Sequence, residues 1–149
     1  DLFTEKLYNS LESCGCMTKN YLLIYSEQLA TEIELLCQNI KAPSNTLFQI
    51  RKSSSSIYAN IREANYGQSK ADMLSKFEIA LKECSETEGW LQLLFNTQAI
   101  SEDTFKLHRN ICGRIRRMLI ASCKTLKENS RWTFLFVLFI FHYSIFIIH

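Results

Sequence analysis

The sequence predicts an all-α fold, an antiparallel up-and-down four-helix bundle with an apolar C-terminal segment. Three observations predict it. Apolar residues recur every three or four positions along four stretches, which is the spacing that keeps one face of a helix buried. Pro occurs once and Gly four times in 149 residues, fewer than the turns of a β-sandwich or an α/β fold require. The length suits a single domain with one core.

The first predicted helix runs from about residue 19 to 41. Its inward positions follow a spacing of four, three, four, three and four residues, at Leu22, Ser26, Leu29, Ile33, Leu36 and Ile40. Pro43 ends this helix, because proline disfavours helical geometry in the residue before it. Ser44 or Asn45 is then the expected N-cap of the next helix.

The second predicted helix runs from about residue 45 to 66. Its inward positions are Leu47, Ile50, Ser54, Ile57 and Ile61. The run Ser53–Ser56 supplies small side chains that allow two helix backbones to approach closely, and a serine hydroxyl can bond to its own helix. Gly67 is the expected C-terminal cap, and Ser69 is the expected N-cap of the following helix.

The third predicted helix, from about residue 70 to 98, has a wide apolar face made of two adjacent stripes. The first stripe is Leu74, Phe77, Leu81, Cys84, Glu88, Leu91 and Phe95. The second stripe is Met73, Ala80, Thr87 and Leu94. Two stripes are expected for a bundle helix that touches two neighbours. Glu88 interrupts the first stripe, so it is either ion-paired or at a boundary between subunits.

The fourth predicted helix begins after Ser101, its expected N-cap. Glu102 and Asp103 occupy the first turn, where their negative charge complements the positive end of the helix. Its inward positions are Phe105, His108, Cys112, Ile115, Leu119, Ser122 and Leu126. We expect the helix to end at Glu128 and Asn129.

The sequence therefore divides into a bundle at residues 17–129 and two end segments. Residues 1–16 precede the first Met and either lie outside the natural coding frame or form a short extra helix. Residues 130–149 form an apolar tail, in which the 18 residues from Trp132 to His149 carry no charge. Three interpretations of the tail remain open: translation past the natural end, a membrane anchor of minimal length, or a buried fifth helix. We expect a cytoplasmic protein, with a tail-anchored membrane protein as the alternative.

Six cysteines do not indicate a disulfide framework here. Four of them fall on or beside apolar helix faces, namely Cys37, Cys84, Cys112 and Cys123. A free thiol at such a position behaves as a small hydrophobic side chain. No secretory signal opens the sequence, so we expect these four cysteines to be reduced and buried.

No residue pattern predicts catalysis, a metal site or a cofactor. Di-iron bundles need Glu-x-x-His on two helices, whereas Glu83 is followed three residues later by Glu86. His108 stands alone on an apolar face, which is typical of a packed core or boundary residue. Nothing places a base beside a nucleophile, and no Gly-rich phosphate loop occurs. We therefore expect a protein that is not an enzyme.

Charge is unevenly distributed although the formal net charge is only +2. Residues 72–103 hold seven acids and two bases, whereas residues 105–127 hold seven bases and no acid. The candidate nucleic-acid-binding residues are Arg51, Lys52, Arg62, Arg109, Arg116, Arg117, Lys124 and Lys127. The candidate residues for salt bridges or oligomer contacts are Glu83, Glu86, Glu88 and Arg114. The basic set either binds phosphates non-specifically or forms a solvated face that is paired between subunits.

Several segments resemble one known family, the four-helix-bundle proteins encoded in intervening sequences of bacterial 23S ribosomal RNA genes. The second helix and the turn after it carry Ser53–Ser56 with Ile57, Ala59, Asn60 and Ile61, then Glu63, Ala64, Tyr66 and Gln68–Asp72. The third and fourth helices carry Ile79–Glu83, Glu86, Thr87, Trp90, Leu91, Ile100 and Ser101. The resemblance covers roughly residues 20–128. It departs at Arg62, where the family usually has a small residue, and at Cys84 and Ser85.

The resemblance implies ring-like homo-oligomers of up-and-down bundles, usually pentamers. A related branch resembles the accessory proteins of diversity-generating retroelements, which bind nucleic acid and a reverse transcriptase through a basic surface. The family has no assigned catalytic residues. The expected partners are therefore copies of this chain, RNA or DNA, and a reverse transcriptase or other nucleic-acid enzyme. The alternatives are a structural self-assembly module without a nucleic-acid role, and a membrane-anchored bundle if the tail is native.

Overall fold

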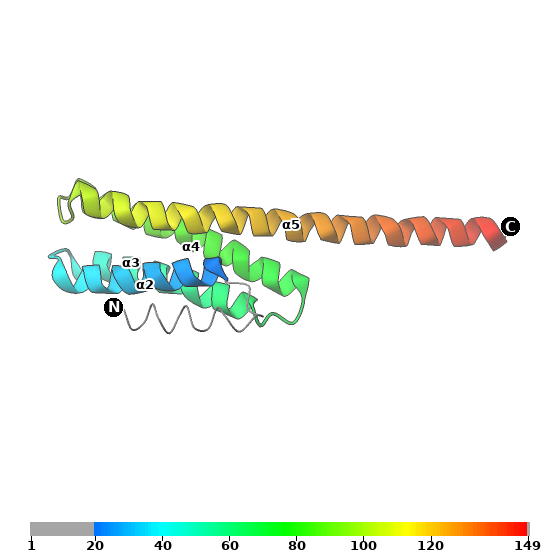
Figure 1. Cartoon of the computed structure of the whole chain (residues 1–149), viewed down its shortest axis with the longest axis horizontal. Helices are drawn as coiled ribbons and strands as arrows, with labels where there is room; N and C mark the ends of the chain where they lie inside the picture. Colours follow the sequence, from blue (N-terminus) through cyan, green and yellow to red (C-terminus); the bar gives the residue numbers. More distant parts are fainter. Residues whose placement is uncertain (1–19, 149) are drawn as a thin grey trace, which may run out of the picture.

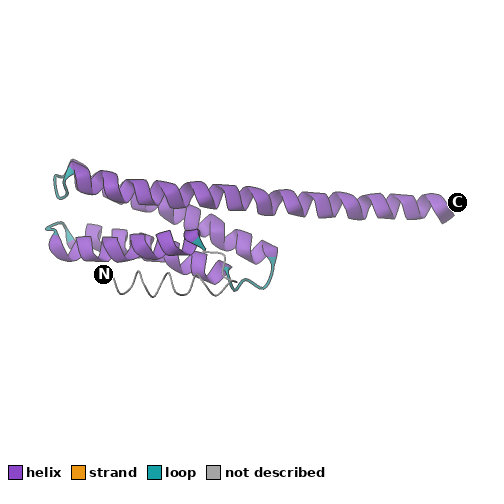
Figure 2. Ribbon diagram, in the orientation of Figure 1, coloured by secondary structure: helices purple, strands orange, loops and turns teal. Residues whose placement is uncertain are grey.

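The computed structural model describes the backbone of residues 20–148 and the side chains of residues 20–128. It contains four helices, α2 (Tyr21–Asn39), α3 (Ser44–Ala64), α4 (Lys70–Asn96) and α5 (Glu102–Ile148) (Figure 1). The connections are short loops, and no strand occurs in the described residues (Figure 2). Each helix packs against the next, and α2 also packs against α5, whereas α2–α4 and α3–α5 are diagonal pairs whose backbones do not approach each other. This arrangement confirms the predicted all-α fold and is that of an up-and-down bundle.

The first three helices begin and end within two residues of their predicted limits. Asn20 caps α2, because its side-chain oxygen accepts a hydrogen bond from the backbone of Leu23 at 3.2 Å. The predicted caps of α4 and α5 are confirmed. The Ser69 hydroxyl accepts a hydrogen bond from the backbone N–H of Asp72 at 3.1 Å, and the Ser101 hydroxyl accepts one from that of Thr104 at 3.2 Å.

Two predicted caps are wrong. The residue at the N-cap of α3 is Pro43, and Ser44 is already the first helical residue, so this helix end has no side-chain cap. The C-cap of α3 is Asn65, and Gly67 does not adopt a positive φ. A glycine suits position 67 for a different reason: an added Cβ would lie 3.2 Å from the carbonyl oxygen of Ala64 and 3.3 Å from a carboxylate oxygen of Asp72.

The core consists of the predicted stripes, except that the buried position shifts by one residue near the ends of two helices. The fully buried large side chains include Leu29, Ile33, Ile50, Ile57, Ile61, Leu91, Leu94, Ile115 and Leu119. Cys37 is buried where Leu36 was expected, and Cys123 is buried where Ser122 was expected. In both cases the buried position is one residue further along. Such a shift turns the inward face by about 100° at the end of a helix.

The most extensive helix contact joins α3 and α4. Ser53 and Thr87 are both fully buried at this contact, and their hydroxyls lie 2.9 Å apart. Each hydroxyl also reaches a carbonyl of its own helix, at Ile50 and Glu83. The small side chain of Ser53 therefore serves the close helix approach that the serine run predicted.

Helix α5 continues to Ile148, beyond the end that we expected at Glu128 and Asn129 (Figure 1). The physical reason is that neither Pro nor Gly occurs after Gly113, so nothing in the sequence interrupts the backbone hydrogen bonds. The proposed N-terminal extension and the side chains of the apolar tail lie outside the described residues. Among the side chains that are described, no helix combines the length and the apolar content of a membrane span.

The four cysteines that were predicted to line apolar faces, Cys37, Cys84, Cys112 and Cys123, are free and buried. Burial raises the pKa of the Cys37 and Cys123 thiols. The pKa of the Cys84 thiol is raised too, chiefly by its contact with the Cys112 thiol and then by burial.

The four buried cysteines should be poorly reactive. Since the thiolate is the nucleophile, a Cys14→Ser/Cys16→Ser variant should react slowly with Ellman's reagent at pH 8. In denaturant all four remaining thiols should react at once. Rapid stoichiometric reaction of the native variant would contradict this packing.

Candidate nucleic-acid interface

The five candidate binding residues on α5 fall into two groups, and the first group faces α4. The Arg116 guanidinium lies 3.5 Å from a carboxylate oxygen of Glu88, and the Lys127 ammonium lies 2.7 Å from one of Glu78. This carboxylate raises the pKa of Lys127. These charges connect two helices of the same chain, so they contribute less to an external basic surface than the sequence count suggested.

The second group points to solvent and consists of Arg109, Arg117 and Lys124, which we call the α5 stripe. These residues are spaced eight and seven apart, or about two helical turns each. Arg109 packs its guanidinium over the ring of Phe105, 5.5 Å from the ring centre. Within the described residues, Arg117 has no carboxylate within 4.0 Å, and Lys124 has only Glu128, at 3.9 Å. Exposed pairs of that length contribute little.

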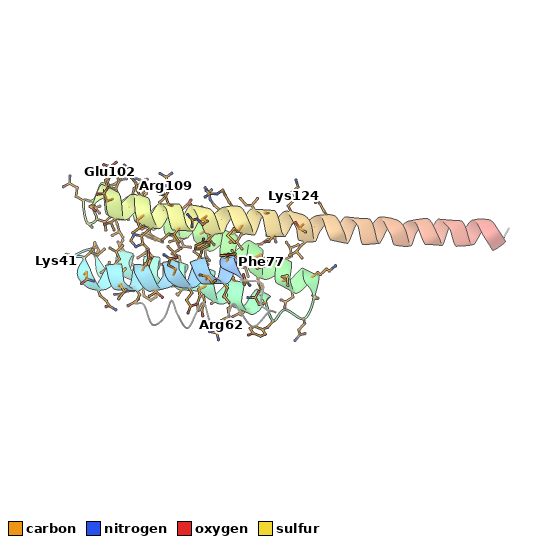
Figure 3. All side chains as sticks on the ribbon, viewed as in Figure 1. Lys41, Arg62, Phe77, Glu102, Arg109 and Lys124 are labelled. Atoms are coloured by element: carbon orange, nitrogen blue, oxygen red, sulfur yellow. The ribbon has the colours of Figure 1, made fainter. Side chains whose placement is uncertain are left out.

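Two of the three predicted binding residues on α3, Arg51 and Arg62, do not join this surface. Arg62 lies on the side of the bundle opposite Arg109 and Lys124 (Figure 3). The reason is topological: α3 and α5 are diagonal and their backbones do not approach each other, so their outward faces point in opposite directions. Arg51 is also engaged, because its Nε lies 3.1 Å from Glu34 of α2. The eight residues predicted as one surface are therefore at least two separate sets.

Of the residues predicted to form salt bridges, Glu88 is the one paired across helices within the described residues. Glu86 accepts a hydrogen bond from the indole of Trp90 at 3.3 Å, and no ion pair between described residues involves Glu83. Relative to Glu88, positions 83 and 86 are rotated by about 140° and 200° around α4, which turns them away from α5. Arg114 faces α2 and places its guanidinium 4.8 Å from the centre of the Tyr25 ring.

His108 is buried, at 5% exposure, as a core or boundary histidine should be. Its Nδ1 lies 2.7 Å from the carbonyl oxygen of Thr104. A carbonyl only accepts, so Nδ1 carries a hydrogen. Its Nε2 faces a carboxylate oxygen of Glu32 on α2, at 3.7 Å. The sequence did not single out Glu32, because the periodicity of α2 does not show which neighbouring helix a residue faces.

The described residues contain no group of three potential metal ligands. His108 and Glu32 supply only two, and the other oxygen of Glu32 already accepts a hydrogen bond from Gln28 at 2.8 Å. The pair therefore reads as a buried polar contact that links α2 to α5.

The chain matches one known protein family in sequence and a solved protein structure in fold. The sequence pattern described as 23S rRNA-intervening sequence protein matches residues 22–121. A solved crystal structure of a protein with unknown function, from the S23 ribosomal protein family of Bacteroides thetaiotaomicron, is 38% identical with a TM-score of 0.67. The match covers 69% of this chain and 98% of that one. No curated protein matches this chain.

Proposed function

The chain belongs to the 23S rRNA-intervening sequence protein family, and we propose that it is a non-catalytic, oligomeric bundle that binds nucleic acid through the α5 stripe. Membership confirms the resemblance drawn from the second and third helices. The observation that carries the proposal is the division of charge on α5. The bases that face α4 are ion-paired to it, whereas among the described residues Arg109 and Arg117 have no carboxylate within 4.0 Å and Lys124 has only Glu128, at 3.9 Å.

Such a stripe suits a phosphate backbone and carries no base recognition of its own. Its three charges extend over 15 residues, or about 22 Å of helix, which is long enough to meet several phosphates of one strand. Lys and Arg that neutralise phosphates release counterions, so affinity falls steeply as salt rises. A nucleic-acid enzyme with its own bound strand is a compatible partner for the same surface.

Filter binding of the full chain to a single strand of about 20 nucleotides tests the proposal. We expect binding at about 50 mM salt and a loss of at least tenfold in affinity at about 300 mM. The absence of binding at the lower salt concentration would exclude the proposed function.

The second candidate function is self-assembly without nucleic acid, and one observation favours it. Large apolar side chains are exposed along α2 and α5, with Leu35 at 53% and Leu107 at 55% exposure. They lie at a similar height in the bundle, because Glu32 faces His108 close by. Exposed apolar side chains that gather on one face are typical of a protein–protein contact.

A Leu35→Glu/Leu107→Glu variant tests this contact by light scattering. We expect the wild-type chain to have a mass of several chains, and the variant to approach the 17.4 kDa of one chain. Lys82→Glu on α4 is a control that adds acidic charge without removing an apolar side chain, and it should leave the mass unchanged. A wild-type mass of one chain would contradict self-assembly.

A further inference from the structure

A groove of about 530 Å³ lies on the side of the bundle away from the α5 stripe, where α3 ends and α4 begins. Its lining includes Tyr58 and Arg62 from α3, Tyr66 and Gln68 from the turn, and Lys76 from α4. The volume falls within the range of about 300–1,000 Å³ that is common for small-molecule sites. We infer that this groove binds one nucleotide unit, with the base stacked on Tyr66 and the phosphate held by Arg62.

Of the four charged residues that line the groove, Lys76 and Glu63 pair with each other, whereas Asp72 and Arg62 have no ion-pair partner within 4.0 Å among the described residues. Lys76 is held by Glu63 at 2.5 Å, and this carboxylate raises the pKa of the lysine. Asp72 accepts a hydrogen bond from the backbone of Gln68 at 3.3 Å. The Arg62 guanidinium has no carboxylate within 4.0 Å among the described residues, so it is the charge that an anion would meet.

The position of Arg62 is defined although it is exposed. Its Nη1 donates to the hydroxyl of Tyr58 at 3.2 Å, and its guanidinium carbon lies 6.0 Å from the centre of that ring. This contact uses one of five N–H donors, and the planar fork of the others suits two oxygens of a phosphate.

Tyr66 provides the aromatic surface. It is 82% exposed, the most exposed large hydrophobic side chain among the described residues. It lies in the turn after α3, and no described ring or cation stacks on it. An aromatic ring in the same groove as a guanidinium without a carboxylate partner is the combination that holds a base and its phosphate in single-strand binding proteins.

The ligand is defined by chemistry, an aromatic base joined to a phosphate. A free mononucleotide and one unit of a single strand share this chemistry. The groove uses none of the α5 stripe, because α3 and α5 are diagonal. The inference therefore stands or fails separately from the proposed function.

The test compares two fluorescent strands of about eight units with equal numbers of phosphates, one of deoxyadenosine and one abasic. The full chain should bind the adenine strand about tenfold more tightly than the abasic strand. Tyr66→Ala should abolish this ratio, and Tyr66→Phe should keep it. Arg62→Gln should weaken binding of both strands. Competition by AMP assigns the site to free nucleotides, whereas a Tyr66-dependent ratio without competition assigns it to a unit within a strand.

Two controls make the test decisive. Tyr21→Ala removes another exposed tyrosine, on α2, and should leave the ratio unchanged. An Arg109→Gln/Arg117→Gln/Lys124→Gln variant should keep the Tyr66-dependent ratio at about tenfold or more, because it removes only base-independent binding on the other side of the bundle. A ratio near one in the wild-type chain, or a ratio unaffected by Tyr66→Ala, overturns the inference.

Discussion

Replacing Ser53 with Leu should lower the free energy of unfolding by about 2–4 kcal/mol. Ser53 is fully buried against Thr87 at the α3–α4 contact. A larger side chain there forces the helices apart, and overpacking of a core typically costs about 1–3 kcal/mol. Loss of the hydroxyl contact adds about 1 kcal/mol. The total is a large part of the roughly 5–15 kcal/mol that stabilises an ordinary domain. Urea denaturation at fixed protein concentration measures it.

Ser55 offers a matched control on the same helix. Its hydroxyl donates to the carbonyl of Lys52 in the same local pattern, but its side chain is exposed. Ser55→Leu should therefore change stability by less than about 0.5 kcal/mol, and Ser53→Ala should cost about 1 kcal/mol. Equal stability of the Ser53→Leu and Ser55→Leu variants would contradict close packing of α3 against α4.

Neutralising the α5 stripe should reduce nucleic-acid affinity on the order of a hundredfold at about 50 mM salt. The variant is Arg109→Gln/Arg117→Gln/Lys124→Gln. Each lost phosphate contact lowers the slope of log affinity against log salt by about 0.7 for a single strand, so three lower it by about 2. Because all three side chains are exposed, the variant should remain folded, which far-ultraviolet circular dichroism checks. Filter binding across a salt series measures the slope.

Two control variants separate this surface from total charge. Lys41→Gln/Lys82→Gln removes two positive charges elsewhere on the bundle and should alter the slope little. Glu78→Gln/Lys127→Gln removes an α4–α5 ion pair at constant net charge and should leave affinity within about twofold. If the two lysine substitutions weaken binding nearly as much as the stripe variant, then net charge and not the α5 stripe determines affinity.

Periodicity predicted most of the fold because each helix buries one continuous face. The stripes of Leu29, Ile33, Ile57 and Leu91 follow from spacing alone, and so do the caps at Ser69 and Ser101. The predicted end of α5 was wrong. Glu128 and Asn129 were expected to terminate the helix, although polar residues do not break a helix as Pro and Gly do.

The candidate site was predicted less well, since it depends on how each helix is turned. Sequence identified the bases of α5 but not which of them meet a carboxylate, because Arg116 and Arg117 are adjacent yet face different surroundings. The contact of Glu32 with His108 requires the relative height of two helices that are far apart in sequence. The separation of Arg62 from the α5 stripe follows from bundle topology, which places second and fourth helices on a diagonal.

The most direct test of the account is lysine acetylation of the full chain with and without a bound single strand, followed by mass spectrometry. Lys124 belongs to the α5 stripe, whereas Lys41 and Lys82 lie elsewhere and are exposed. The account predicts that bound nucleic acid slows acetylation of Lys124 several-fold while Lys41 and Lys82 react as before. Unchanged labelling of Lys124 in the saturated complex would contradict it.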